Sequence, residues 1–219
     1  MLINNLNSKF ENIINDLTNK INRQNNEIKE LKNIINKQNK TIENLVDIPF
    51  SDSLIIGENV EQKKALEDWI NPKKNIKSTL LYRLTRDGNS PKIFHEKCDN
   101  KGPTLVLTKI KDGGNILGGY TPLSLDSSSG PKNDLDSFLF SLTDNKKFPK
   151  ATNNQSINCS SSYKPWFASF GFHQSLSSNQ LIIYKQNEKY QNANEIIPSI
   201  QKRFDDIYDI TELEVFKID

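Results

Sequence analysis

The sequence has few residues of the kinds that form disulfides and bind metals. Its 219 residues include two cysteines, Cys98 and Cys159, and two histidines, His95 and His173. Small secreted domains depend on a denser set of cysteines, so the sequence does not indicate a disulfide framework. A reducing, cytoplasmic compartment is the simplest interpretation.

Long apolar runs and an excess of charge of one sign are also absent. No segment approaches the roughly 18 apolar residues that indicate a membrane span. The N-terminus lacks the basic and apolar regions of a signal peptide. The 29 basic and 27 acidic residues give a net charge of +2, whereas nucleic-acid binding requires a concentrated basic face. We therefore expect neither membrane insertion nor nucleic-acid binding.

Motifs that carry chemistry are missing as well. There is no Gly-x-Ser-x-Gly elbow, no Walker-type phosphate loop and no Gly-x-Gly-x-x-Gly fingerprint. His95 and Cys98 are three positions apart, but thirteen residues separate Cys159 from His173, and structural zinc sites use pairs with short gaps. A cysteine nucleophile would need a histidine base and an orienting Asp or Asn. We expect no catalytic residue, metal or cofactor, and we keep a peroxide-reactive Cys98 or Cys159 as an alternative.

Residues 1–47 contain neither proline nor glycine, and a heptad pattern fills them. From Ile3 to Leu45 the pattern holds for about six heptads, which predicts a coiled coil. Isoleucine at positions a with leucine at positions d favours a parallel dimer of the chain with itself. The predicted contact residues are Ile14, Leu17, Ile21, Gln24, Ile28, Leu31, Ile35, Gln38, Ile42 and Leu45.

Polar residues refine this coiled coil. Gln24 and Gln38 occupy d positions, where a polar side chain costs stability and helps to fix register and strand number. Glu27 at g can pair with Lys32 at e of a parallel partner. Apolar residues at g, such as Ile34, widen the stripe and leave a trimer open. A long helix that folds back on its own domain is the alternative to self-association.

Pro49 ends the heptads, because proline cannot continue a helix interior. We predict a coiled coil over 1–47, a linker over 48–52 and one globular domain over 53–219. A helix is expected to follow Asn59, which with Gln62 resembles a capping box.

Residues 90–121 hold the clearest local signals of the domain. Ser90 and Pro91 predict a short helix from Pro91 to Cys98, since proline loses nothing at the first helical position. Phe94 and Cys98 then share one face of this helix, and we expect both to lie in the core. Two apolar runs around Lys-Asp-Gly-Gly predict a hairpin. Further strands are expected in 78–84, 136–142, 156–160, 180–185 and 212–218.

Two clusters admit a structural and a functional interpretation. Arg83, Arg86 and Asp87 lie close together, and a salt-bridged turn is favoured over a contact with an anion or a protein. Residues 163–172 hold five aromatic side chains, which we expect mostly in the core. An exposed Trp166 would instead be an anchor for a partner.

Taken in order, these blocks resemble a TLDc domain, the domain of the oxidation-resistance protein family. The resemblance spans roughly Ser51 to Asp219, and its most specific part runs from Leu80 to Ile110. It implies an α+β fold in which a two-sheet antiparallel β-sandwich is flanked by short helices. The family signature residues, which have no agreed catalytic role, are Arg86, Asp87, Gly88, Phe94, His95, Cys98, Asp99, Gly118, Gly119 and Tyr120.

The resemblance also implies a function. The family is linked to protection from oxidative stress, and several members bind the vacuolar-type proton-pumping ATPase and influence its assembly. No enzymatic activity is established for the domain, so a non-enzymatic interaction protein with this pump as a partner is expected. A structural scaffold without pump binding is an alternative. Asn89, Pro122 and Leu123 depart from the family pattern, and residues 184–209 do not align with it.

Overall fold

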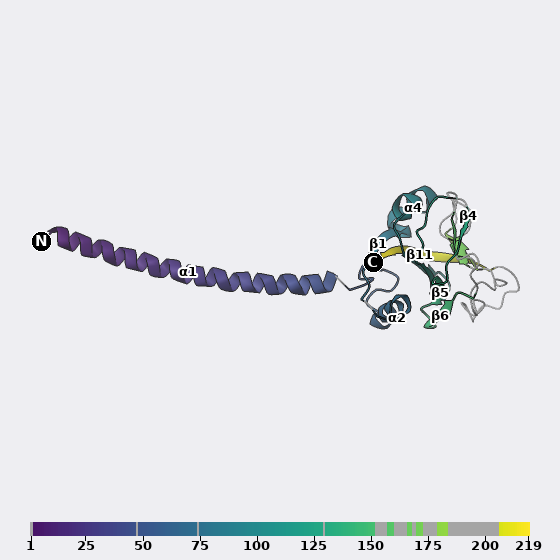
Figure 1. The fold of residues 1–219 in the computed structure, drawn as a ribbon, viewed down its shortest axis with the longest axis horizontal. Coiled ribbons are helices and arrows are strands. Elements are labelled where there is room, and N and C mark those ends of the chain that lie inside the picture. The colour runs from purple at the N-terminus through teal and green to yellow at the C-terminus, as the bar shows by residue number, and fades with distance from the viewer. Residues whose placement is uncertain are drawn as a thin grey trace. The chain divides into compact units, whose positions relative to one another are not determined.

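The computed structural model describes most of the chain. The described residues are 2–46, 48–73, 75–128, 130–151, 157–159, 166–167, 170–172, 179–183 and 206–219. His173, Tyr163, the side chain of Trp166 and residues 184–205 therefore lie outside what is described, together with the predictions made for them. The chain divides into two compact units, Met1–Ile48 and Pro49–Asp219 (Figure 1).

The first unit is the helix α1, Leu2–Val46, as the heptad pattern predicts. Its apolar stripe is open to solvent in the single chain, with exposed fractions from 49% at Ile28 to 74% at Ile3. The side chains of Ile42 and Leu45 are not among those described. Among the described residues, no helix is both long enough and apolar enough to cross a bilayer.

Three shorter helices belong to the second unit. Helix α2, Val60–Ile70, begins where Asn59 accepts a 3.0 Å hydrogen bond from the backbone N–H of Gln62, which confirms the predicted N-cap. Helix α4, Pro91–Cys98, has the predicted bounds and carries proline in its first turn. Between them α3, Leu84–Asp87, forms a single helical turn that begins at Leu84, the last residue of the predicted strand, and Gly88 ends it at a φ of 81°.

The strands form two antiparallel sheets that share one strand. The first sheet contains six strands in the order β1, β11, β2, β3, β5, β6. The second sheet runs from β4 through β7, β8, β9 and β10 to the first part of β11. The bounds are β1 Ser78–Arg83, β2 Thr104–Ile110, β3 Ile116–Thr121, β4 Gly130–Lys132, β5 Phe138–Ser141, β6 Lys146–Pro149, β7 Ile157–Cys159, β8 Trp166–Phe167, β9 Phe170–Phe172, β10 Gln180–Ile183 and β11 Asp206–Ile218.

Two hydrophobic cores lie on the two faces of the first sheet. The inner core joins the sheets, because Val106 and Val215 of the first sheet share it with Phe167 and Leu181 of the second. Helix α4 packs on this side. The outer core forms where α2 and residues 50–56 cover the other face, against side chains that include Phe140. The predicted α+β fold with two antiparallel sheets is therefore confirmed (Figure 1).

Several strands differ from the sequence prediction. The last strand, β11, has 13 residues and begins at Asp206, six residues before the predicted start. The strands β4, β6, β8 and β9 were not predicted. Strands β4 and β6 lie at the two ends of the strand order. Each contains a proline, which is tolerated at sheet edges but counts against a strand when the sequence is read by pattern.

Candidate functional site

Helix α4 fixes the central part of the family signature. Phe94 and Cys98 are both buried in the inner core, as predicted. The ring of Phe94 packs edge to face against the rings of Tyr82 and His95. The centroid distances are 5.4 Å to Tyr82 and 5.3 Å to His95. Burial raises the pKa of the Cys98 thiol well above its usual range. A buried neutral thiol is a packing group, so Cys98 behaves here as a small apolar side chain.

His95 lies on the outer side of the same helix and forms a polar cluster. Its Nδ1 lies 2.8 Å from Oδ1 of Asp99, and Oγ of Ser127 donates a 2.5 Å hydrogen bond to the other carboxylate oxygen. Lys92 and Glu96 line the adjoining open cavity of about 410 Å³. The Ser127 hydroxyl is therefore oriented towards the carboxylate of Asp99, which both Ser127 and His95 contact.

The second cysteine, Cys159, is also buried. It lies in β7, and burial raises the pKa of its thiol. Neither Cys98 nor Cys159 takes part in a disulfide. A reactive thiol requires exposure and a lowered pKa, so the geometry of both cysteines is that of structural residues.

Arg86 and Asp87 form an ion-paired turn at the end of α3. Nη2 of Arg86 lies 2.8 Å from Oδ2 of Asp87, and Nζ of Lys97 lies 3.3 Å from Oδ1. The hydrogen bond from Arg86 and the backbone N–H of Arg83 lower the pKa of Asp87 to about 2. Arg86 and Asp87 therefore form the salt-bridged turn that the sequence favoured, whereas the guanidinium of Arg83 pairs with Glu214.

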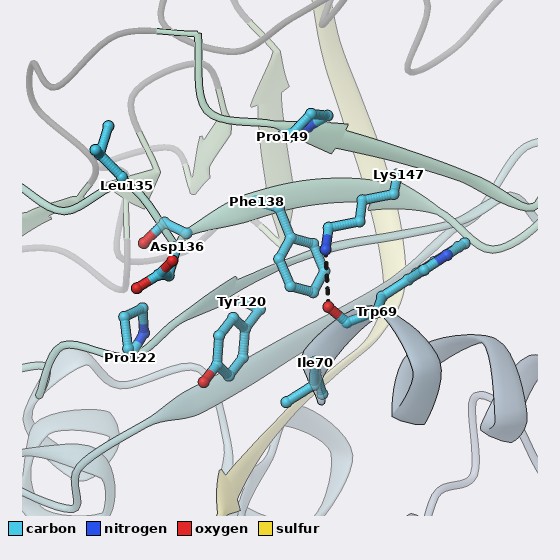
Figure 2. A pocket seen from close by; sticks show the side chains of 10 residues that line it. Trp69, Ile70, Tyr120, Pro122, Leu135, Asp136, Phe138, Lys147 and Pro149 are labelled. Carbon is cyan, nitrogen blue, oxygen red and sulfur yellow. Dashed lines mark hydrogen bonds between the residues drawn. The ribbon is translucent and has the colours of Figure 1, made fainter. Parts of the chain in front are cut away.

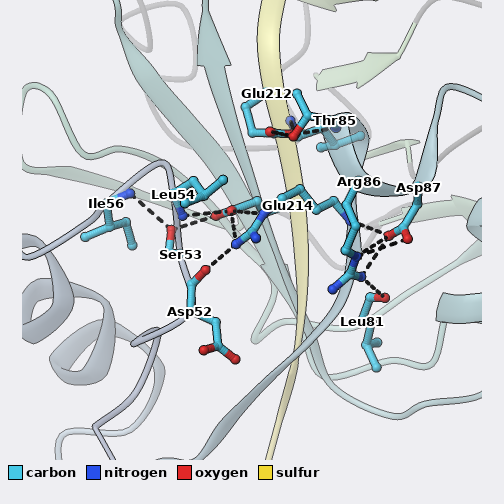
Figure 3. A network of polar contacts seen from close by, with 12 residues as sticks. Asp52, Ser53, Leu54, Ile56, Leu81, Thr85, Arg86, Asp87, Glu212 and Glu214 are labelled. Carbon is cyan, nitrogen blue, oxygen red and sulfur yellow. Dashed lines mark hydrogen bonds and ion pairs between the residues drawn. The ribbon is translucent and has the colours of Figure 1, made fainter.

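Glu214 is the centre of a buried polar network (Figure 3). One carboxylate oxygen accepts a 2.6 Å hydrogen bond from Oγ of Ser53. The other accepts from the backbone N–H of Leu54 at 2.9 Å and from Nε of Arg83 at 2.8 Å. Arg83 also donates to the carbonyl of Asp52. This network joins β1, β11 and the first residues of the domain, and the buried carboxylate of Glu214 is paired with the guanidinium of Arg83.

Glu212, two residues before Glu214 in β11, is a second buried glutamate whose carboxylate accepts hydrogen bonds from a distant segment. Its carboxylate accepts hydrogen bonds from the backbone N–H and the hydroxyl of Thr85 at the start of α3. Both glutamates are buried. Neither Glu212 nor Glu214 was selected from the sequence, although Arg83 lies opposite Glu214 on the paired strand β1, and a register prediction could use that pairing.

The two signature glycines in β3 lie where neighbouring groups leave no room for a side chain, Gly118 against its own sheet and Gly119 against the second sheet. A Cβ atom on Gly118 would lie 2.1 Å from the carbonyl oxygen of Val106 and 2.3 Å from Cζ of Phe140. A Cβ atom on Gly119 would lie 2.9 Å from the ring of Phe167. Gly118 is therefore in close contact with the backbone of β2, and Gly119 is in close contact with an aromatic ring.

Tyr120, the last signature residue, lies apart from the others in an open groove (Figure 2). Its ring packs against Phe138 with a centroid distance of 5.2 Å. Trp69 at the end of α2 forms another wall of this groove. The signature is thus divided among the core, an ion-paired turn, a His–Asp cluster and a groove. It forms no single reaction centre among the described residues.

No group of three or more histidine, cysteine, aspartate or glutamate side chains suited to a metal ion occurs in the described part of the chain. The signature residues instead line two open cavities, at Tyr120 and at His95, and form ion pairs such as that of Arg86 with Asp87. Such surfaces are suited to binding another molecule.

The comparisons with known proteins agree with this geometry. The family model of the TLDc domain matches residues 51–219, which covers most of the chain. No curated protein matches this chain. The matched residues include every strand, all the signature residues and the Glu214 network. The chain therefore belongs to the TLDc domain family.

Proposed function

We propose that this protein is a non-enzymatic cytosolic interaction protein in which α1 joins copies of the chain and each copy displays a TLDc domain. One observation carries the proposal: α1 presents a continuous isoleucine and leucine stripe that is about half exposed in the single chain. Exposed apolar stripes of this length are a cost in water unless a partner helix covers them. A parallel dimer is the assembly that the a and d residues favour.

The family suggests what the displayed domains bind. TLDc proteins are linked to oxidative-stress resistance, and several of them bind the vacuolar-type proton-pumping ATPase. We propose that the pump's peripheral sector is a partner of this chain. Two domains on one coiled coil would raise avidity if both engage together, because the second contact is then intramolecular.

A non-enzymatic role is supported by the environment of the candidate groups. Both thiols are buried, and their pKa values are raised. Ser127 binds the carboxylate of Asp99, and His95 is engaged by the same carboxylate. These groups are arranged as packing and surface-fixing contacts, which is the arrangement expected of a binding domain.

The test is a pull-down with the full chain. The wild-type chain and the monomeric variant Ile28→Lys/Ile35→Lys are immobilised and exposed to purified peripheral subunits of the pump. The proposal predicts enrichment by the wild-type chain and weaker retention by the variant, because avidity is lost. The charge-matched control Asn26→Lys/Asn33→Lys changes the f positions two residues before each of these isoleucines, on the opposite side of the helix, and should behave as wild type.

Other outcomes select the alternatives. Absence of enrichment by either chain, with an intact oligomer, would favour a structural scaffold without pump binding. Protection of cells from peroxide that is lost in a folded Cys98→Ser/Cys159→Ser variant would favour a reactive cysteine.

A further inference from the structure

The groove around Tyr120 is built by four separate elements. Trp69 and Ile70 end α2, Tyr120 lies in β3, Phe138 lies in β5 and Lys147 lies in β6. These residues enclose an open cavity of about 330 Å³ (Figure 2). This volume suits one or two side chains of a ligand and is too small for the surface of a folded domain to enter.

The floor and one wall of the groove are aromatic and held in place. Tyr120 and Phe138 pack with their rings inclined by 31°. Trp69 lies against the buried ring of Phe140, with a centroid distance of 6.0 Å. Because these rings are fixed by core residues, a ligand that stacks on them orders few protein side chains, which favours binding.

The positive charge in the groove is already engaged. Nζ of Lys147 donates a 2.8 Å hydrogen bond to the backbone carbonyl of Trp69. The same ammonium lies 4.2 Å from the centroid of the Phe138 ring, in a cation–π contact. Figure 2 shows this side chain reaching across the groove to α2. Lys147 therefore bridges two walls, and its ammonium already has a carbonyl and an aromatic ring as neighbours within the protein.

The negative charge in the groove acts on Lys147 and Tyr120 through space and is open to solvent. Asp136 is exposed at the opposite end of the groove, next to Leu135 and Pro122. Its carboxylate forms no hydrogen bond or ion pair with the other described residues, while its backbone N–H is bound by Oδ1 of Asp134. Leu135 beside it is 61% exposed. The groove thus offers aromatic faces, an exposed apolar rim and one available carboxylate.

We propose that this groove binds a linear segment of a partner protein that carries an arginine beside an apolar side chain. The guanidinium would pair with the Asp136 carboxylate and lie along the ring of Tyr120, and the apolar side chain would pack on Trp69. Arginine fits better than lysine, because its planar fork binds a carboxylate with two hydrogen bonds and stacks on aromatic rings.

This inference goes beyond the proposed function. The groove belongs entirely to the TLDc domain, and it requires neither assembly through α1 nor binding to the pump. A partner recognised here would be a peptide motif that many proteins could carry, so the groove can recruit a second protein to the assembly.

The test uses the full chain and pools of short synthetic peptides. Each pool fixes one central residue as Arg, Lys, Glu or Ala and randomises its neighbours among apolar residues. Binding is measured by fluorescence polarisation to wild type, Asp136→Asn, Trp69→Ala and the control Asp112→Asn. Asp112 is exposed in the hairpin turn between β2 and β3, outside the groove. Circular dichroism verifies that each variant is folded.

The expected result is preferential binding of the arginine pool. Its affinity should exceed that of the alanine pool by about tenfold. Asp136→Asn should remove that preference, and Asp112→Asn should keep it. A folded Trp69→Ala variant should bind both the arginine pool and the alanine pool more weakly than wild type does, since the apolar contact is removed.

Three results would overturn the proposal. In the first, no pool binds. In the second, Asp136→Asn and Asp112→Asn weaken binding equally, which would mean that only overall charge matters. In the third, the glutamate pool binds best, which would make Lys147 the recognising group.

Discussion

Oγ of Ser53 donates a 2.6 Å hydrogen bond to Oε2 of Glu214, a residue 161 positions later in the chain. Both residues are buried. The contact ties the first residues of the domain to its last strand, β11, which is the strand shared by both sheets. The segment that follows α1 is therefore built into the fold, with Phe50 fully buried three residues before Ser53.

The Glu214→Ala variant should lose much of the domain's stability. Removing the carboxylate leaves the Arg83 guanidinium and the Ser53 hydroxyl without their shared acceptor in a buried site. Breaking such a buried pair costs about 3–5 kcal/mol of unfolding free energy. Urea unfolding followed by circular dichroism measures the change. Glu96→Ala, on the exposed side of α4, is the control and should change the value by less than about 0.5 kcal/mol. Equal values for both variants would contradict the role given to Glu214.

Gly118→Ala tests the close contact between β3 and its neighbours. The new methyl group would lie 2.1 Å from a backbone oxygen that the sheet holds in place. We expect a loss of about 3 kcal/mol, the upper end of the usual cost of overpacking, since a methyl group at this distance forces strands apart. The control is Gly114→Ala in the hairpin turn, where no atom lies within 4 Å but φ is +68°. There only the left-handed backbone cost of about 1–2 kcal/mol applies. A smaller loss for Gly118→Ala than for Gly114→Ala would contradict the contact.

Asp87 should make the stability depend on acid pH. Its pKa in the folded protein is about 2, whereas an unfolded aspartate has a pKa near 3.9. Because the folded pKa is the lower one, the carboxylate stabilises the fold above about pH 4, and this contribution of about 2 kcal/mol is lost as the pH falls towards 2.

The Asp87→Asn variant isolates this contribution. Its unfolding free energy should lie below that of wild type at neutral pH, and the two curves should converge towards about pH 2. Asp126, whose pKa is also lowered to about 2 through Lys132, titrates in both proteins and cancels in the difference. Parallel curves over the whole range would show that Asp87 does not have the lowered pKa.

The two thiols should resist modification in the folded protein. Burial and raised pKa values keep Cys98 and Cys159 protonated and covered. With Ellman's reagent near pH 8, native protein should react at least about a hundredfold more slowly than protein in denaturant, because reaction requires opening of the structure. Rapid native labelling of either cysteine would revive the reactive-cysteine alternative.

Local patterns in the sequence were sufficient for some elements of the fold. Ser90 and Pro91 placed α4 at its observed bounds, because a proline at the helix start and an i, i+4 apolar pair are both local signals. Gly113 and Gly114 have positive φ in the hairpin turn. Glycine is the residue that adopts this conformation most easily, so the glycine pair predicted the turn correctly. In contrast, β6 carries two lysines and a proline, and only Phe148 of its side chains is buried.

The site was less predictable than the fold for a physical reason. In β11, Glu212 and Glu214 alternate with apolar residues, a pattern that predicts glutamate side chains facing the solvent. These glutamates are buried because Ser53 and α3, distant in sequence, cover them. The groove has the same origin, since Trp69 and Asp136 line one cavity only after three strands and α2 have packed. Such contacts depend on tertiary arrangement, which local periodicity does not encode.

The measurement that tests the central claim most directly is the mass of the full chain in solution. Sedimentation equilibrium at micromolar concentration should give about twice the 25.1 kDa of one chain. The same measurement on Ile28→Lys/Ile35→Lys should give one chain, because charges at positions a oppose burial of the stripe. Asn26→Lys/Asn33→Lys should remain dimeric. A wild-type chain with the mass of a monomer, or a lysine variant with the mass of the wild type, would contradict assembly through α1.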